Sequence, residues 1–222
     1  MKALQLIATM SAVACSLLVA RADPIALYNT GVDSAGNIQA NYSPELHYSL
    51  VSTPGGTSSV RVAADSNGYP VFVWDGYGAT SNSLSEWIGP NSDYYLNGPV
   101  GNYDYQISFS LAGLDPATAS ITGQWSTDDL GTNILINGHS TGYTAGFATN
   151  WSSFAISNPG YFVAGNNTLD FIVYNSGGPT GLRVEMTGTA QPSAVPDGGA
   201  TATLLGSALL GLAALRRRIT RA

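Results

Sequence analysis

The sequence predicts an all-β fold, an antiparallel β-sandwich or jelly roll over residues 23–190, with a signal peptide before it and a single transmembrane helix after it. Three observations lead to this prediction. Several segments alternate apolar and polar residues with the period of two that is typical of half-buried strands. Clusters of Gly, Pro and Asn separate these segments, and no amphipathic helical pattern occurs between residues 23 and 195. Apolar runs occupy both ends of the chain.

The N-terminal residues 1–22 have the three parts of a secretory signal peptide. Lys2 provides the basic start, an apolar stretch runs to Ala20, and the small residues Ala20 and Ala22 define a cleavage site after Ala22. A lipoprotein signal with acylation at Cys15 is the alternative, but the apolar run continues for five residues beyond that cysteine. Because Cys15 is the only cysteine, the rest of the chain has no disulfide and no thiolate chemistry.

The alternation is clearest in residues 102–111, 119–125, 167–175 and 181–188. Their apolar faces carry Tyr103, Tyr105, Ile107, Phe109, Leu111, Ile121, Trp125, Leu169, Phe171, Val173, Leu182, Val184 and Met186. Polar residues take the alternate positions, so we expect Gln124, Arg183 and Glu185 to point outward. One-sided alternation in many strands predicts two antiparallel sheets packed face to face.

The charge of the chain is unevenly placed. Between Asp23 and Val195 there are 13 acidic residues and only two basic ones, Arg61 and Arg183, which gives a formal charge of −11. Such a surface lacks the Lys and Arg residues that neutralise phosphates, so nucleic acid is excluded as a partner. Carboxylates are ligands for calcium, which stays open as a cofactor. The alternative is a solvated acidic surface that keeps an exported protein soluble.

The one motif for nucleophilic catalysis lacks the context that it needs. Residues 138–142 read GHSTG and match the G-x-S-x-G pattern, which requires a helix after the serine and a histidine further along the chain. The sequence YTAGFATNW that follows is not helical, and His139 is the second of only two histidines. Histidine and cysteine form no cluster with the spacing of a zinc or iron site. The sequence therefore predicts no enzyme and no resident transition metal.

Two aromatic residues are candidates for contact with a ligand. Trp87, in the segment SEWIG, is expected to be a platform on which a sugar ring stacks, and core packing is the alternative. His47, in the segment ELHYS, is the second candidate. Its alternative is a buried, hydrogen-bonded residue of the core.

Two polar residues complete the candidate ligand site. Asp128, which precedes Asp129 in the turn-like segment STDDLGTN, would contact sugar hydroxyls or hold calcium, whereas acidic residues in turns commonly cap backbone donors. Asn137 would also contact hydroxyls, although the Asn-Gly pair at 137–138 suits a tight turn. We expect the site at the loop end of the sandwich that gathers SEWIG and STDDLG.

The C-terminal residues combine a polar motif, an apolar segment and a basic end. The linker at 191–199 contains Val195, Pro196, Asp197, Gly198 and Gly199. The basic tail at 216–222 begins with Arg216, Arg217 and Arg218. Between them, residues 200–215 carry no charge and would form a helix about 24 Å long. If Gly198 and Gly199 are included, the helix is nearly as long as the hydrocarbon core of a membrane is thick, about 30 Å. The arginines would stay on the cytoplasmic side.

The tail VPDGGATATLLGSALLGLAALRRR resembles the PEP-CTERM class of bacterial sorting tails, in the variant whose motif reads Val-Pro-Asp-Ser-Gly. Here Gly198 takes the place of the serine. The resemblance implies recognition by an exosortase, a membrane-embedded, cysteine-dependent transpeptidase that cuts near the motif. It also implies an inner-membrane precursor and a product at the cell surface or in the extracellular matrix of bacteria that make exopolysaccharide or biofilm. A plain membrane anchor is the alternative.

The body is similar to the galactose-binding-domain-like jelly rolls that often precede such tails, and to jelly-roll modules of bacterial glycosidases. The segments LHYSL, GNYDYQISFSLAGLDPATASITGQW and GNNTLDFIVYNSGGPTGLRVEMTGTA carry this resemblance. It implies a non-catalytic protein that binds carbohydrate, with extracellular polysaccharide as its partner. A purely structural matrix protein without a small-molecule site and a glycan-acting enzyme are the alternatives.

Overall fold

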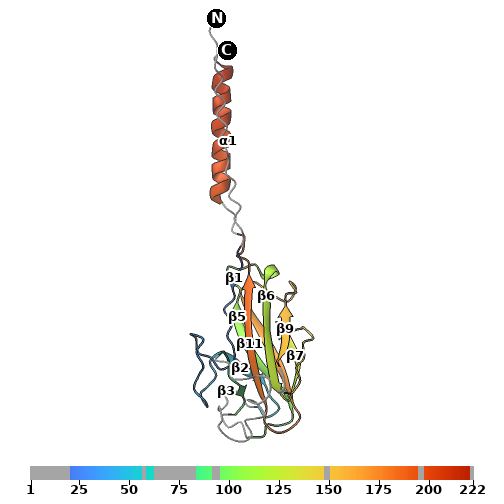
Figure 1. The fold of residues 1–222 in the computed structure, drawn as a ribbon. Coiled ribbons are helices and arrows are strands. Elements are labelled where there is room, and N and C mark those ends of the chain that lie inside the picture. Colours follow the sequence, from blue (N-terminus) through green and yellow to red (C-terminus); the bar gives the residue numbers. More distant parts are fainter. Residues whose placement is uncertain are drawn as a thin grey trace.

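The computed structural model describes residues 21–56, 59–62, 84–91, 96–147, 151–194 and 198–220. In this part, the chain forms two antiparallel β-sheets that face each other, and a long helix stands apart from them (Figure 1). The antiparallel sandwich predicted from the alternation is thereby confirmed. The predicted signal peptide up to residue 20 and the motif residues Val195, Pro196 and Asp197 lie outside the described residues.

Six strands form the first sheet and five form the second. The first sheet has the order β3 (Arg61–Val62), β4 (Ile88–Gly89), β11 (Gly181–Ala190), β6 (Ser120–Asp128) and β9 (Ser152–Ile156), and β1 (Asp23–Pro24) also pairs with β11. The second sheet has the order β2 (Tyr48–Ser52), β5 (Gly101–Ser110), β10 (Asn166–Asn175), β7 (Leu130–Ile136) and β8 (His139–Ser140). A short 3-10 helix, η2 (Pro116–Thr118), precedes β6.

The core lies between the two sheets and contains every residue that the alternation assigned to the apolar faces. Aromatic rings join the sheets at its centre. Trp125 of β6 and Phe154 of β9 lie 5.7 and 6.0 Å from Phe171 of β10, measured between ring centroids. Tilted and edge-on pairs at such separations are favourable, so these contacts contribute to the stability of the sandwich.

The Trp125 ring also explains a glycine in β7. A Cβ atom at Gly131 would overlap the Trp125 ring and lie 2.9 Å from Ala145 Cβ. Because Trp125 is completely buried in a close-packed core, its ring has no space into which it can move. Glycine is therefore required at position 131 for the two sheets to approach this closely.

The tail forms helix α1 (Gly198–Ile219), which begins two residues before the predicted apolar helix and continues into the arginines. Its 22 residues span about 33 Å. Several of its leucines are exposed, namely Leu205, Leu209, Leu210 and Leu212. Among the described residues, no helix combines the length and apolar character needed to cross a membrane. The predicted transmembrane segment is thus helical but is not confirmed as a membrane span.

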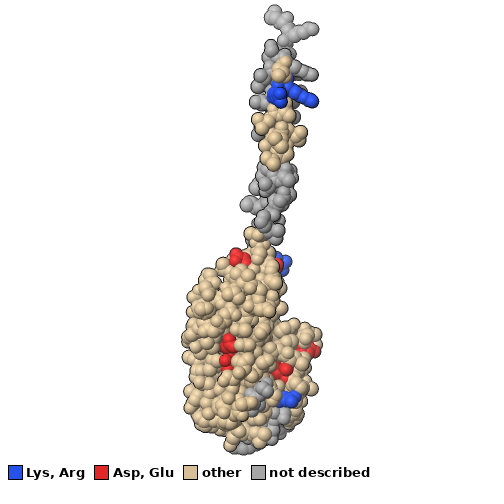
Figure 2. Space-filling model, turned by 180° about the vertical axis from the view of Figure 1, so that it is seen from behind, with Lys and Arg blue, Asp and Glu red and all other residues tan. Residues whose placement is uncertain are grey.

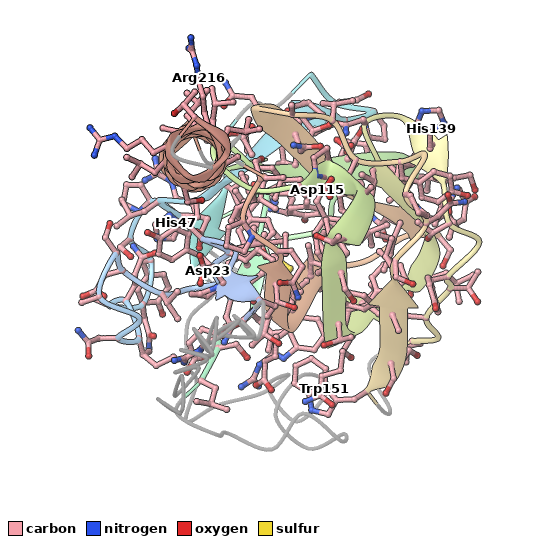
Figure 3. The ribbon with its side chains drawn as sticks, turned by 90° about the horizontal axis from the view of Figure 1, so that it is seen from above. Asp23, His47, Asp115, His139, Trp151 and Arg216 are labelled. Carbon is pink, nitrogen blue, oxygen red and sulfur yellow. The ribbon has the colours of Figure 1, made fainter. Side chains whose placement is uncertain are left out.

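Charged side chains are sparse on the sandwich. Figure 2 shows Asp and Glu atoms in a few separate patches, within a largely uncharged surface on the face in view. Basic side chains also lie on α1, where Arg216 and Arg217 are exposed. Arg216 points away from the helix axis (Figure 3). This arrangement follows the uneven charge distribution of the sequence.

Candidate functional site

Trp87 and Asp128, two of the predicted ligand residues, lie at the same end of the first sheet. Trp87 immediately precedes β4, in which Ile88 pairs with Leu182 of β11. Asp128 is the last residue of β6 and pairs with Gly181, the first residue of β11. The segments that contain the two residues therefore flank the start of β11, at one end of the sheet as the sequence led us to expect.

Burial contradicts the stacking role that the sequence assigned to Trp87. Only 2% of its surface is exposed, so neither face of the ring is open to a sugar. Trp87 is instead a packing residue beside β4. The expectation was wrong because a sugar can stack on an aromatic residue in a loop only where no other residue packs over the ring. The local sequence does not show which residues pack there.

Asp128 is also buried, with 4% of its surface exposed, and its backbone carbonyl accepts a hydrogen bond of 2.6 Å from Thr180 Oγ1. The neighbouring Asp129 accepts bonds of 2.6 Å from the backbone N–H and the hydroxyl of Ser176. Asp129 thereby caps the turn between β10 and β11. Among the described residues, no three His, Cys, Asp or Glu side chains form a group that would suit a metal ion. The contacts of Asp129 support the turn-capping alternative for the acidic pair.

Asn137 lies at the opposite end of β7 from Asp128, and its side chain is engaged within the protein. Its Nδ2 donates to Asn167 Oδ1 and to the Tyr161 carbonyl, both at 2.8 Å. Its Oδ1 accepts from the Thr168 backbone N–H at 2.9 Å. Its φ of 50° is the left-handed conformation that an Asn-Gly turn requires. Asn137 therefore forms part of a tight turn, which was the alternative to a role in ligand binding. The structure does not bring it near Trp87.

His47 lies just before β2, on the opposite side of the molecule from His139 (Figure 3). Its ring stacks on Tyr28, with 3.6 Å between centroids and 1° between planes. Its backbone N–H donates to Glu45 Oε1 at 2.8 Å, while its Nε2 is buried and has no hydrogen-bond partner among the described residues. Burial raises the pKa of Glu45, although hydrogen bonds from the His47 and Gly31 N–H groups lower it. These contacts make His47 a packed residue that is separate from the other candidates.

A groove of about 480 Å³ lies on the outer face of the first sheet. It is lined by Asn29, Leu84, Thr122, Gly123, Gln124, Glu185, Met186 and Thr187. Strands β6 and β11 provide most of these residues, and Leu84 belongs to the segment that continues into SEWIG. The groove therefore adjoins one of the two segments in which the sequence placed the site.

A buried hydrogen-bonded network underlies the groove. Ser85 Oγ donates to Glu185 Oε1 and Gln124 Nε2 donates to Glu185 Oε2, both at 2.9 Å. Arg183 Nε donates to Ser85 Oγ at 2.8 Å, and Arg183 Nη2 donates to the Ser85 carbonyl at 2.7 Å. The Arg183 guanidinium also lies 5.5 Å from the centre of the Trp151 ring, which is a cation–π distance. Ser85 thus links the buried guanidinium to the carboxylate of the groove.

The outward orientation predicted for Arg183 and Glu185 is correct, but exposure to solvent does not follow from it. Only 1% and 9% of their surfaces are exposed. The segment at 84–87 lies over this part of the sheet, held to it by the Ser85 contacts. The alternation rule takes the outer face of an antiparallel sheet to be in water. Here the segment at 84–87 covers part of the outer face of the first sheet, so the polar side chains on that part form a second buried layer.

The groove presents several kinds of binding group. Each Glu185 oxygen receives one donor within the network and retains lone pairs for a further one. Thr122 and Thr187 are exposed, and Leu84, with 54% of its surface exposed, adds an apolar patch. Fixed polar groups beside apolar surface suit a ligand that has many hydroxyls and an apolar face. Glu185 is the one carboxylate among the described residues that line the groove, whereas most glycoside hydrolases use two.

Ser85, Gln124 and Glu185 are missing from the ligand residues predicted from the sequence. The outward positions of Gln124 and Glu185 in two alternating segments were the only available signal. The two side chains meet because β6 and β11 are neighbours and Gln124 pairs with Glu185. That pairing depends on the sheet topology, which local alternation does not determine.

A comparable polar pair lies on the outer face of the second sheet. Gln106 Nε2 donates to Asp170 Oδ1 at 2.6 Å, and the two residues are directly opposite each other in β5 and β10. Burial, with a smaller effect from the charge of Asp170, raises the pKa of Asp104 to about 6. Neither aspartate lines the groove. Gln106 is therefore a matched control for Gln124.

Comparison with known proteins identifies the tail. Residues 194–219 match the model of the VPDSG-CTERM motif. This confirms the PEP-CTERM-like sorting tail, with Gly198 at the serine position of the motif. The match does not extend into the sandwich, and no curated protein matches the chain.

Three solved structures are similar to parts of the chain. The CBM36-1 domain of a multidomain xylanase from the hindgut metagenome of Trinervitermes trinervoides has 15% identity and a TM-score of 0.33, with 53% of this chain and 88% of that chain covered. The GH26-CBM35 β-(1,4)-mannanase of Podospora anserina has 12% identity and a TM-score of 0.32, with 62% and 26% covered. A family 35 carbohydrate-binding module from an environmental isolate has 18% identity and a TM-score of 0.29, with 44% and 74% covered.

Proposed function

We propose that the chain is an exported protein that binds carbohydrate without catalysis, and that the sugar lies in the groove between β6 and β11. The observation that carries this proposal is the Glu185 carboxylate, which Ser85 and Gln124 hold in place beneath the groove. A carboxylate that is already fixed loses little further freedom when a ligand binds, so its hydrogen bonds contribute more fully to affinity.

Sugar hydroxyls match the groups that the groove presents. They would donate to the free lone pairs of Glu185, and they would both donate to and accept from the hydroxyls of Thr122 and Thr187. Neutral hydrogen bonds contribute about 0.5–1.5 kcal/mol each, and bonds to a charged group about 1.5–3 kcal/mol. Affinity at a single site should therefore be modest, and retention in a matrix would depend on many copies acting together.

The charge of the body indicates the class of glycan. Thirteen acidic and two basic residues between positions 23 and 195 repel polyanions at low salt, where screening is weak. A neutral or cationic glycan is therefore the proposed ligand. Extracellular polysaccharide that contains such sugars would be the partner of the exported protein.

The tail supports export as the destination of the chain. Its VPDSG-CTERM motif is followed by a helix with exposed leucines and by exposed arginines. We propose that this helix associates with the inner membrane in the precursor, and that an exosortase cuts near the motif. The product would then reach the cell surface or the extracellular matrix.

A glycan array probed with the full chain tests the proposed function. The unmodified protein should bind neutral or cationic glycans in preference to acidic ones, with and without a calcium chelator. Gln124→Ala removes a donor that holds Glu185, and should weaken binding to the same glycans. Gln106→Ala makes the same change on the opposite face and should bind as the unmodified chain does. Failure of the unmodified chain to bind any glycan would favour the purely structural alternative.

A further inference from the structure

A second depression lies beside β9, the edge strand of the first sheet. Its volume is about 360 Å³, and it is lined by Thr141, Tyr143, Ala155, Ile156, Ser157, Asn158 and Tyr161. Strand β9 and the segments on either side of it supply these residues. None of them is among the ligand residues predicted from the sequence or among those that line the groove.

Hydrogen bonds fix both tyrosine rings of the depression. Tyr143 Oη donates to the Ala155 carbonyl at 2.6 Å, and Tyr161 Oη donates to the Ser140 carbonyl at 3.0 Å. The Tyr161 ring also stacks on His139, with 5.3 Å between centroids and 5° between planes. Both rings remain partly exposed. Rings held in this way lose little freedom when a flat apolar surface packs against them.

Polar groups that make no hydrogen bond within the described chain line the same depression. Asn158 Oδ1 accepts from the Gly160 N–H at 3.0 Å, but the Nδ2 of the same side chain has no hydrogen-bond partner among the described residues. The exposed Ser157 hydroxyl likewise makes no hydrogen bond to them. Aromatic faces beside unused donors and acceptors are the combination that a sugar ring requires, since it has apolar C–H faces and hydroxyls around its edge.

The depression lies next to the groove on the same sheet. Thr122 lines the groove, Ala155 lines the depression, and these two residues are directly opposite each other in β6 and β9. Both are exposed, and directly opposite residues of an antiparallel pair have Cβ atoms about 4.5–5.5 Å apart on the same face. One pair of residues therefore separates the two hollows.

We infer that the Tyr143–Tyr161 depression is a second sugar subsite, which continues the groove so that the protein binds a glycan chain rather than a single sugar. This inference rests on the proposed function of the groove. A pyranose ring would pack on the tyrosines and use the free Asn158 and Ser157 groups, while sugars further along the chain occupy the groove over β6 and β11. The protein then favours long glycans over short ones.

Calorimetric titration of the full chain tests the inference. The probes are the neutral hexasaccharides cellohexaose, xylohexaose and mannohexaose, together with the corresponding disaccharides. Tyr161→Ala should weaken hexasaccharide binding about tenfold and leave disaccharide binding within about twofold, because the disaccharide uses the groove alone. Gln124→Ala should weaken both. Tyr174→Ala, at a half-buried outward position of β10 in the other sheet, is the matched control and should change neither.

The outcomes separate this inference from the proposed function. If Tyr161→Ala binds the hexasaccharide as the unmodified chain does while Gln124→Ala does not, the second subsite is wrong and the groove stands. If the unmodified chain binds none of these sugars and no glycan on the array, both are wrong. If Tyr161→Ala fails to fold, Asn158→Ala replaces it, because this exposed change keeps both rings. Asn158→Ala should then selectively weaken hexasaccharide binding, and unchanged hexasaccharide affinity would overturn the inference.

Discussion

Replacing Ser85 with alanine should destabilise the fold by more than the removal of one hydroxyl ordinarily does. The Ser85 hydroxyl donates to Glu185 and accepts from Arg183, at 2.9 and 2.8 Å. Both partners are charged, and hydrogen bonds to charged groups contribute about 1.5–3 kcal/mol each. All three residues are at least nine-tenths buried, so water does not readily replace the lost contacts. After partial relaxation of the network we expect the free energy of unfolding to fall by about 3 kcal/mol.

Ser126→Ala is the matched control for this prediction. Ser126 pairs with Arg183 across the same sheet, is completely buried, and has a hydroxyl with no hydrogen-bond partner among the described residues. Its removal should leave the free energy of unfolding within about 0.5 kcal/mol or raise it. Urea unfolding of the full chain, followed by tryptophan fluorescence, measures both variants, and the m-values should agree. A loss below about 1 kcal/mol for Ser85→Ala, or equal losses for the two variants, would refute the network as described.

Three further predictions concern other parts of the molecule. Asp104→Asn should raise the free energy of unfolding by about 1 kcal/mol at pH 8, because a pKa of about 6 against the ordinary 3.8 disfavours the charged form and partial solvent exposure reduces the full effect. The gain should decline as the pH falls from about 6 and vanish only well below the ordinary pKa of 3.8, where this carboxyl is protonated in both folded and unfolded states, and urea titrations that show a pH-independent gain would contradict it. Gly131→Ala should cost about 1–3 kcal/mol in thermal unfolding, because its methyl group meets the buried Trp125 ring, and a neutral change would show that the sheets can separate there. The intact mass of the exported protein should lack Arg216 to Arg218, and their presence would leave only a plain membrane anchor.

The sequence was sufficient for the core because burial in a sandwich follows a local period. Every apolar residue assigned to an inward face, from Tyr103 to Met186, lies in the core. The tail could also be predicted from the sequence, since its motif, apolar segment and arginines are contiguous. Both predictions used only residues that are close together along the chain.

The candidate site was harder to predict because its residues come from distant segments. Ser85 and Glu185 are 100 positions apart in the chain, and they meet only because the segment at 84–87 covers β11. Trp87, at the end of this segment, is itself buried, which removed the expected platform. Asn137 had the right chemistry, but its side chain is used in hydrogen bonds to Asn167 and Thr168 and lies at the other end of β7. A covering segment and hydrogen bonds between distant segments were the two effects that local patterns did not reveal.

The central claim is that the groove over β6 and β11 binds a glycan, and calorimetry on three forms of the full chain tests it most directly. The titrant is the neutral oligosaccharide that binds best on the array. The unmodified chain and Gln106→Ala should bind it with equal affinity, and Gln124→Ala should bind about tenfold more weakly, with all three melting within a few degrees of one another. Equal affinity of Gln124→Ala and Gln106→Ala, or a loss confined to Gln106→Ala, would contradict the claim and place any sugar on another face of the sandwich.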